Sequence, residues 1–288
     1  MTNSGRAEFE VSIDGGRIGG IRTDGDPPAL LLHGGPGLSF TYMDGLVDEL
    51  DGLVGAISYQ QRGLAPSSVG APYGLRRHVE DAVALLDALG LGRAWMIGHS
   101  WGGYLAMAIA AWAPERTVGW IAVDPLGITG DGGMDDLGKW LGRNVTLDEL
   151  ARARAIEEDE EAHISDAETV SESLRIYWPH YFADPAKAPP YEDLSGNDRV
   201  YADAIPDAFA LNETGELVRD LIASGRPGVV VTGGESGLRR ASEESAAAAG
   251  ARLVVVEGSG HFPWLEVPGS IRDVVGSTLG DPYSGAGT

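Results

Sequence analysis

Apolar residues along the chain gather in five short runs that lack polar alternation, and each run ends at a glycine or a polar residue. Such runs are typical of strands in a parallel sheet that is covered on both faces, because neither face of such a strand meets water. The runs are ALLLHGG (29–35), AWMIGHS (94–100), GWIAVDP (119–125), GVVVTGG (228–234) and RLVVVEGSGH (252–261).

Segments with helical periodicity alternate with these runs. Residues 75–90 predict a helix that stops at Gly90, because their apolar positions recur at helical spacing. Its apolar face consists of Leu75, Val79, Ala82, Val83, Leu86 and Leu89. Alternating strands and helices indicate an α/β protein with a mostly parallel, doubly wound sheet. Near the N-terminus, Asp14-Gly15-Gly16 marks the turn of an antiparallel hairpin.

The alternation stops between about Gly127 and Gly225, where no apolar strand run occurs and both ends show helical periodicity. The strand pattern resumes at Gly228, as expected if this region is an insertion between two core strands. We therefore predict an α/β core formed by residues 1–126 and 226–288, with a helical cap formed by residues 127–225.

Composition narrows the possible partners. The 288 residues are 43% hydrophobic, enough for a substantial core, and the formal net charge is −22. Nucleic acid and anionic membrane surfaces would repel such a chain, so neither is expected as a partner. No cysteine is present, which excludes disulfides and thiolate chemistry, and no apolar run approaches the roughly 18 residues of a membrane span. A cytoplasmic protein acting on a small molecule is expected.

Ser100 lies between two glycines in the pattern Gly98-His99-Ser100-Trp101-Gly102. An apolar run precedes this pattern, and the helical stretch GYLAMAIAAWA follows it. Side chains at the two glycine positions would collide with the neighbouring strand and helix at a sharp strand-to-helix turn. Such a turn exposes the serine hydroxyl at the carboxyl end of the sheet, near the positive end of the next helix. The pattern predicts that Ser100 is a nucleophile.

A neutral serine needs a base, and His261 is the best placed of the six histidines. It follows the last apolar run in a glycine-containing loop, so it is expected at the carboxyl end of the sheet. His180, in the predicted cap, is kept as a possible contact for the substrate.

The stretch HGGPG (33–37) follows the first apolar run, and its glycines and proline leave backbone N–H groups free to face a cavity. We predict that the N–H groups of Gly35 and Trp101 hold a developing oxyanion. A dinucleotide-binding loop is disfavoured, because the glycine-rich fingerprint would need glycine where Phe40 stands. Phosphate-loop and zinc-protease motifs do not occur, so no metal or cofactor is expected.

Four motifs in this order resemble the α/β-hydrolase superfamily, and within it the proline iminopeptidase-like branch: HGGPG, YQQRGLAPSS (59–68), GHSWGGYLAMAIA and GSGHFPWLEVP. The resemblance spans nearly the whole core and only loosely includes the cap. It implies the α/β-hydrolase fold, with Ser100 as the nucleophile, His261 as base and acid, and Gly35 and Trp101 as donors to the oxyanion. Gln61-Arg62-Gly63 would form a structural loop near the site. Relatives that open epoxides and haloalkanes carry aspartate at the nucleophile position, so Ser100 argues against those reactions.

The third member of the triad departs from the family pattern. Most members carry an aspartate shortly after the strand that corresponds to GVVVTGG, whereas a strict alignment places Ser236 or Gly237 there. Glu235 is the nearest carboxylate and precedes His261 by 26 residues, about the family's interval. We therefore expect Glu235 to orient the imidazole. The alternative is Asp124, at the end of the preceding core strand, where an aspartate also serves as a turn residue.

The cap departs from the family as well. The resembled aminopeptidases hold the substrate's free amino group with cap carboxylates, one of them in a stretch like E-N-H-Y-F. This chain reads YWPHYF (177–182), and the lost glutamate removes a charge-assisted partner for an ammonium ion. The acidic run at 157–161 could replace it, although contiguous glutamates are typical of a solvated face. Candidate substrate contacts in the cap are Tyr177, Trp178, His180 and Tyr181.

Three functions follow, in order of preference. The first is a serine hydrolase that cleaves an ester, lactone or amide of a mainly apolar small molecule through an acyl-enzyme. The second is a proline iminopeptidase-type aminopeptidase. The third is a protein of the same fold without a hydrolytic role, acting as a cyclase, a lyase or a binding protein.

Overall fold

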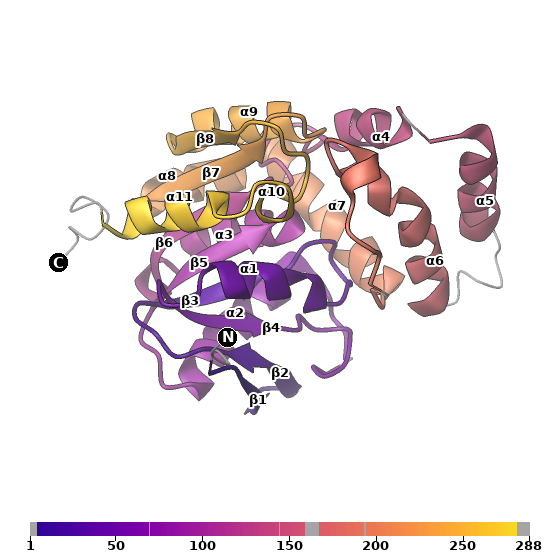
Figure 1. Ribbon diagram of the computed structural model, residues 1–288. Helices are drawn as coiled ribbons and strands as arrows, with labels where there is room; N and C mark the ends of the chain where they lie inside the picture. Colours follow the sequence, from indigo (N-terminus) through magenta and orange to yellow (C-terminus); the bar gives the residue numbers. More distant parts are fainter. Residues whose placement is uncertain (1–4, 69, 144, 159–166, 193, 281–288) are drawn as a thin grey trace.

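The computed structural model describes residues 5–68, 70–143, 145–158, 167–192 and 194–280, and centres on one sheet of eight strands (Figure 1). The strand order is β1-β2-β4-β3-β5-β6-β7-β8. Strands β3 to β8 are parallel to one another, and the N-terminal hairpin adds two antiparallel strands at one edge. The strands are β1 (Ala7–Ile13), β2 (Gly16–Arg22), β3 (Pro28–Leu32), β4 (Gly55–Tyr59), β5 (Ala94–His99), β6 (Thr117–Val123), β7 (Gly228–Gly233) and β8 (Arg252–Val256).

All five predicted strands and the predicted hairpin are present. The sequence analysis missed one strand, β4, which pairs with β2 on one side and β3 on the other. Its sequence GAISY has only five residues, of which Gly55 and Ser58 are not apolar side chains. The sequence therefore shows no apolar run here, although all five residues are buried. Pairing with β2 and β3, rather than its own hydrophobicity, therefore makes this segment a strand.

Helices cover both faces of the sheet, as a doubly wound fold requires. One apolar layer contains buried residues of α2, α3, α7 and α8, and the other contains those of α1, α10 and α11. The helices are α1 (Asp44–Glu49), α2 (Leu75–Ala88), α3 (Trp101–Trp112), α4 (Met134–Gly142), α5 (Leu147–Glu158), α6 (Ala167–Tyr177), α7 (Asp198–Thr214), α8 (Glu216–Ser224), α9 (Arg239–Ala249), α10 (Pro263–Glu266) and α11 (Ser270–Leu279). None of the helices in the described ranges is both long and apolar enough to cross a membrane.

The chain between β6 and β7 is helical, in agreement with the pattern of residues 127–225. Figure 1 shows α4, α5 and α6 together at one end of the molecule, away from the hairpin. The last two helices of this region join the core: α8 packs against α3, and its Leu217 and Leu221 lie with Ala204 and Ala208 of α7 in the same apolar layer as α2 and α3. The C-terminal part of the predicted cap thus covers the core.

Candidate active site

Ser100 occupies the strained turn between β5 and α3. Its φ of 55° and ψ of −122° lie in a region that side-chain-bearing residues rarely adopt. A Cβ atom on Gly98 would lie 1.9 Å from the Gly102 carbonyl oxygen, and one on Gly102 would lie 1.9 Å from the Leu32 carbonyl oxygen. Only glycine fits at both positions, which is the steric reason for the Gly-x-Ser-x-Gly pattern. The turn leaves the serine side chain on the pocket wall.

His261 lies in the loop after β8 and is nearly fully buried. Its Nδ1 lies 2.6 Å from Oδ2 of Asp124, and its main-chain N–H donates to the Tyr181 carbonyl over 2.9 Å. A carboxylate at Nδ1 holds the proton on that nitrogen, so the lone pair of neutral His261 is on Nε2. His261 and Ser100 both line the same pocket, and the Nε2 lone pair is suited to accept a proton there.

Asp124 is completely buried directly after β6, with a φ of 42°. The Thr232 hydroxyl and the Gly233 N–H donate to its Oδ1 over 2.7 and 3.2 Å. The Ser236 hydroxyl donates to Oδ2 over 2.5 Å, beside the bond with His261. Four donors thus surround this one buried carboxylate and fix its orientation toward His261.

The expected contact between Glu235 and His261 is corrected to the alternative, Asp124. Glu235 follows β7 with its side chain exposed, and its main-chain N–H donates to the Ser259 carbonyl over 2.9 Å. Ser236, one of the two residues that could stand where the family pattern has aspartate, instead donates to Asp124. Since β6 and β7 are neighbours, a carboxylate at the end of either strand can reach the same point, and this chain uses β6.

The loop after β3 lies beside Ser100. Gly35, with a φ of 50°, lines the pocket, and Trp101 is the first residue of α3, directly after Ser100. Within the described residues, the N–H groups of Gly35 and Trp101 have no protein acceptor. The neighbouring Gly34 N–H is occupied, because it donates to the Tyr42 hydroxyl. The role of the Gly35 and Trp101 N–H groups as donors to an oxyanion stays a prediction.

Gln61 braces this region, in keeping with the structural role that the resemblance implied. Its amide donates to the His33 carbonyl over 2.8 Å, and its carbonyl oxygen accepts from the Trp101 indole over 3.1 Å. The His33 ring accepts from the Gln61 main-chain N–H at Nε2 over 3.0 Å. Burial lowers the pKa of His33 to about 4, so this ring stays neutral at neutral pH.

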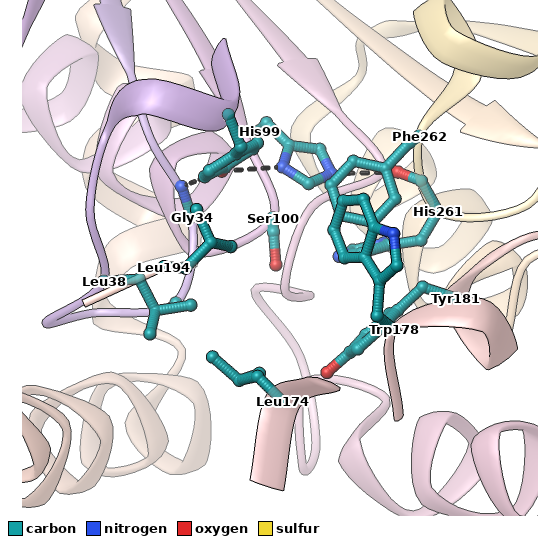
Figure 2. A pocket seen from close by; sticks show the side chains of 12 residues that line it. Gly34, Leu38, His99, Ser100, Leu174, Trp178, Tyr181, Leu194, His261 and Phe262 are labelled. Carbon is teal, nitrogen blue, oxygen red and sulfur yellow. Dashed lines mark hydrogen bonds between the residues drawn. The ribbon is translucent and has the colours of Figure 1, made fainter. Parts of the chain in front are cut away.

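The pocket in front of Ser100 is small and mainly apolar, with a volume of about 70 Å³ (Figure 2). Figure 2 shows the Ser100 hydroxyl projecting into the space between Leu38, Leu174 and Tyr181. The lining residues are Gly34, Gly35, Leu38, Tyr42, His99, Ser100, Leu174, Trp178, Tyr181, Leu194, His261 and Phe262. An adjoining cavity of about 220 Å³ shares Tyr42, Trp178 and Leu194 with it.

The structure brings two of the four cap candidates, Trp178 and Tyr181, to the pocket. Tyr181 stacks on the His261 ring with 5.4 Å between the ring centroids, and burial raises the pKa of its phenol to about 12. Tyr177 and His180 do not belong to the pocket wall that the described residues form, and His180 is buried. Residues 159–166, which include most of the acidic run, lie outside the described residues.

Six pocket residues were not assigned to the site from the sequence: Leu38, Tyr42, His99, Leu174, Leu194 and Phe262. Tyr42 lies within η1 (Thr41–Met43), just before α1, and no motif marks it. His99 was visible within Gly98-His99-Ser100 but was not assigned to the site. Its Nε2 lies 2.8 Å from the His261 carbonyl oxygen, and its Nδ1 lies 2.9 Å from the Tyr42 hydroxyl. Among the described residues, no group of three or more His, Cys, Asp or Glu could hold a metal ion.

Comparison with known proteins places the chain among hydrolases. A family profile described as "Alpha/beta hydrolase family" matches residues 29–274. A crystal structure of a hydrolase from Pseudomonas aeruginosa PA01 superposes with a TM-score of 0.68 at 24% identity, covering 97% of this chain and 100% of that one. This likeness shows the fold.

Curated proteins match this chain with higher sequence identity than that structure does, but over a shorter part of the chain. The chain is 39% identical over 97 residues to a proline iminopeptidase of Lactobacillus helveticus, covering 32% of each protein. It is 35% identical over 105 residues to haloalkane dehalogenase 2 of Mycobacterium tuberculosis, covering 36% of this chain and 37% of that protein. The aligned part is thus about a third of each relative's length, and the relatives differ in their named reactions.

Proposed function

Because the chain belongs to the alpha/beta hydrolase family, we propose that it is a serine hydrolase that cleaves an ester, lactone or amide of a small, mainly apolar molecule. The observation that carries this proposal is the 2.6 Å bond between His261 and Asp124 beside a pocket that also contains Ser100. These are the nucleophile, base and orienting acid that acyl transfer needs.

In the proposed reaction, the Ser100 oxygen attacks the carbonyl carbon of the substrate while its proton passes to Nε2 of His261. The carbonyl electron pair moves to its oxygen, and the N–H groups of Gly35 and Trp101 donate to that oxyanion. Collapse breaks the bond to the alcohol or amine, which takes the proton from His261. Water then attacks the acyl-enzyme by the same route and restores Ser100. Asp124 stays charged throughout and stabilises the imidazolium.

The sizes of the two cavities suggest which part of the substrate binds in each. The pocket at Ser100 has about 70 Å³, well below a dry cavity of about 150 Å³ that holds a benzene molecule. We infer that it takes a short acyl group. The adjoining cavity of about 220 Å³ is larger and is lined by Pro189, Pro190 and Leu265, among others, so it suits the alcohol or amine part.

An aminopeptidase of the proline iminopeptidase type is the second candidate. The described residues that line the Ser100 pocket include no carboxylate, which disfavours a bound ammonium group there. One observation favours this candidate. Asp44 and Glu192 line the adjoining cavity, where their carboxylates could bind a cationic amine.

The deciding experiment compares hydrolysis of p-nitrophenyl acetate and of prolyl-naphthylamide by the wild-type protein, with Ser100→Ala as the blank. We expect serine-dependent cleavage of the ester and a loss of several orders of magnitude in kcat in the variant. Serine-dependent cleavage of the prolyl amide would instead favour the second candidate. Equal rates for both proteins, together with no labelling of Ser100 by a fluorophosphonate, would point to a non-hydrolytic role.

A further inference from the structure

A chain of partly or fully buried hydrogen bonds connects the loop after β3, which contains Gly34 and Gly35 and is called the oxyanion loop below, with the loop that carries His261. The Gly34 N–H donates to the Tyr42 oxygen, the Tyr42 hydroxyl lies 2.9 Å from Nδ1 of His99, and Nε2 of His99 lies 2.8 Å from the His261 carbonyl oxygen. Figure 2 shows His99 between Gly34 and His261. The chain therefore spans the site beside Ser100.

The direction of each bond follows from the last one. A carbonyl oxygen can only accept, so Nε2 of His99 carries the hydrogen. Burial keeps the pKa of His99 well below its usual value, so the ring is neutral and Nδ1 has a lone pair. The Tyr42 hydroxyl must then donate to Nδ1, and its oxygen is left to accept from the Gly34 N–H. Every donor in the chain has one acceptor, and the Tyr42 proton is not available to a substrate.

We propose that Tyr42 and His99 are positioning residues that fix the oxyanion loop and the His261 loop at a set separation on either side of Ser100. This inference rests on the proposed serine hydrolase function. In this role, Tyr42 and His99 affect the rate of the chemical step through the main chain of Gly34 and His261. They do not contact the reacting atoms.

Other bonds of the two loops lead to the region between β6 and β7. The Asn197 N–H donates to the Gly37 carbonyl over 2.7 Å, and the His261 N–H donates to the Tyr181 carbonyl over 2.9 Å. Each loop is thus bonded to that region separately. The chain through Tyr42 and His99 connects the loops within the core instead, so it can hold their geometry independently of the cap.

The pair is also enclosed by rigid neighbours. The His99 ring lies 4.9 Å from the Phe262 ring and 4.8 Å from the Trp264 ring, measured between centroids, and the Tyr42 ring contacts the same two residues. Side chains held by packing keep one rotamer, which a positioning role requires. A displacement of about 1 Å in a reacting group can cost roughly 100-fold in rate.

The test uses Tyr42→Phe, which removes one hydroxyl and keeps the ring, and His99→Gln, which can keep a donor to the His261 carbonyl but loses the Nδ1 acceptor. Tyr104→Phe is the matched control, because the buried Tyr104 hydroxyl also bonds twice, to the Ala208 carbonyl at 3.1 Å and to Asn212 at 3.2 Å. All variants are assayed with p-nitrophenyl acetate, and their melting temperatures are measured.

We expect kcat to fall by about 10-fold in Tyr42→Phe and in His99→Gln while KM changes by less than about twofold. Tyr104→Phe should lose a similar amount of thermal stability and keep the wild-type kcat. The double variant Tyr42→Phe/His99→Gln should lose no more than Tyr42→Phe alone, because Tyr42→Phe already breaks the bond that His99→Gln removes. The shape of the pH–rate profile should stay the same, since the pair reaches His261 through its carbonyl.

A Tyr42→Phe protein with wild-type kcat would overturn the positioning role, provided that the wild-type ester hydrolysis depends on Ser100. Equal loss of kcat in Tyr42→Phe and Tyr104→Phe would also overturn it, since the effect would then follow stability alone. Absence of any serine-dependent hydrolysis in the wild-type protein would mark failure of the proposed function itself, which separates the two conclusions.

Discussion

The carboxylate that accompanies His261 is decided at the level of single residues. Asp124 and Glu235 follow neighbouring strands, but only Asp124 is buried and bonded to the imidazole. Ser236 takes part in the arrangement by donating its hydroxyl to Asp124. The acid has therefore moved one strand along the sheet relative to the pattern in most of the resembled family, while the point in space that it reaches is retained.

This arrangement predicts that Asp124→Asn lowers kcat for p-nitrophenyl acetate by about 10⁴-fold, because an amide at this place favours the wrong tautomer of His261. Glu235→Gln, the control, should keep kcat within about twofold, since its side chain is exposed and away from the ring. A larger loss in Glu235→Gln than in Asp124→Asn would contradict the assignment of Asp124.

A second prediction concerns His33, whose neutral ring accepts from the Gln61 N–H. Its pKa is about 4 in the folded protein, against 6.5 for an unperturbed histidine. Between these values the unfolded chain binds a proton that the folded chain does not, so the free energy of unfolding falls as the pH falls.

For this one group, lowering the pH from about 7 to about 5 should cost about 2 kcal/mol of stability. Urea unfolding of wild type and His33→Gln at several pH values in this range measures the difference, since the variant lacks the titrating ring. The same slope in both proteins would show that His33 is not the source.

At the scale of elements, the β5–α3 turn depends on close contact between backbones. Gly102→Ala would place a methyl group 1.9 Å from the Leu32 carbonyl oxygen, so we expect a loss of more than about 3 kcal/mol in stability. Gly138→Ala in α4 is the control, because its added Cβ meets nothing within 4 Å and alanine favours helix by about 1 kcal/mol. Thermal unfolding of the two variants should move in opposite directions.

Residues from the region between β6 and β7 and from the loops beside the parallel strands line the pocket together. Leu174 and Trp178 come from the region between β6 and β7, whereas Leu38 comes from the loop after β3. With a volume of about 70 Å³, the pocket should accept acetyl and propionyl esters and exclude an octanoyl chain. A series of p-nitrophenyl esters should therefore show a falling kcat/KM as the acyl chain lengthens.

Leu174→Ala should shift that preference toward longer chains, because it removes a side chain that projects into the space beside Ser100. Its control is Leu147→Ala, since Leu147 is 84% exposed and does not line the pocket. An octanoyl ester preferred by the wild-type protein would show that the acyl group occupies the larger adjoining cavity instead.

At the scale of the whole molecule, strand and helix patterns in the sequence were sufficient for the fold class. Three kinds of feature depend on local chemistry, and each is present: the apolar runs, the hairpin turn at Asp14-Gly15-Gly16 and the helix at 75–90. β4 was missed because its five residues carry a weak local signal and are buried only through pairing with β2 and β3.

What the sequence alone determined is the set of local features: the glycines around Ser100, the loop with Gly35, and a histidine after the last strand. Each of these depends on steric or torsional limits that act within a few residues. Tertiary structure decided the rest. Whether Asp124 or Glu235 meets His261, whether Tyr177 or Tyr181 lines the pocket, and how Tyr42 reaches His99 all depend on which segments the sheet and cap bring together, and residues far apart in sequence carry no local sign of that contact.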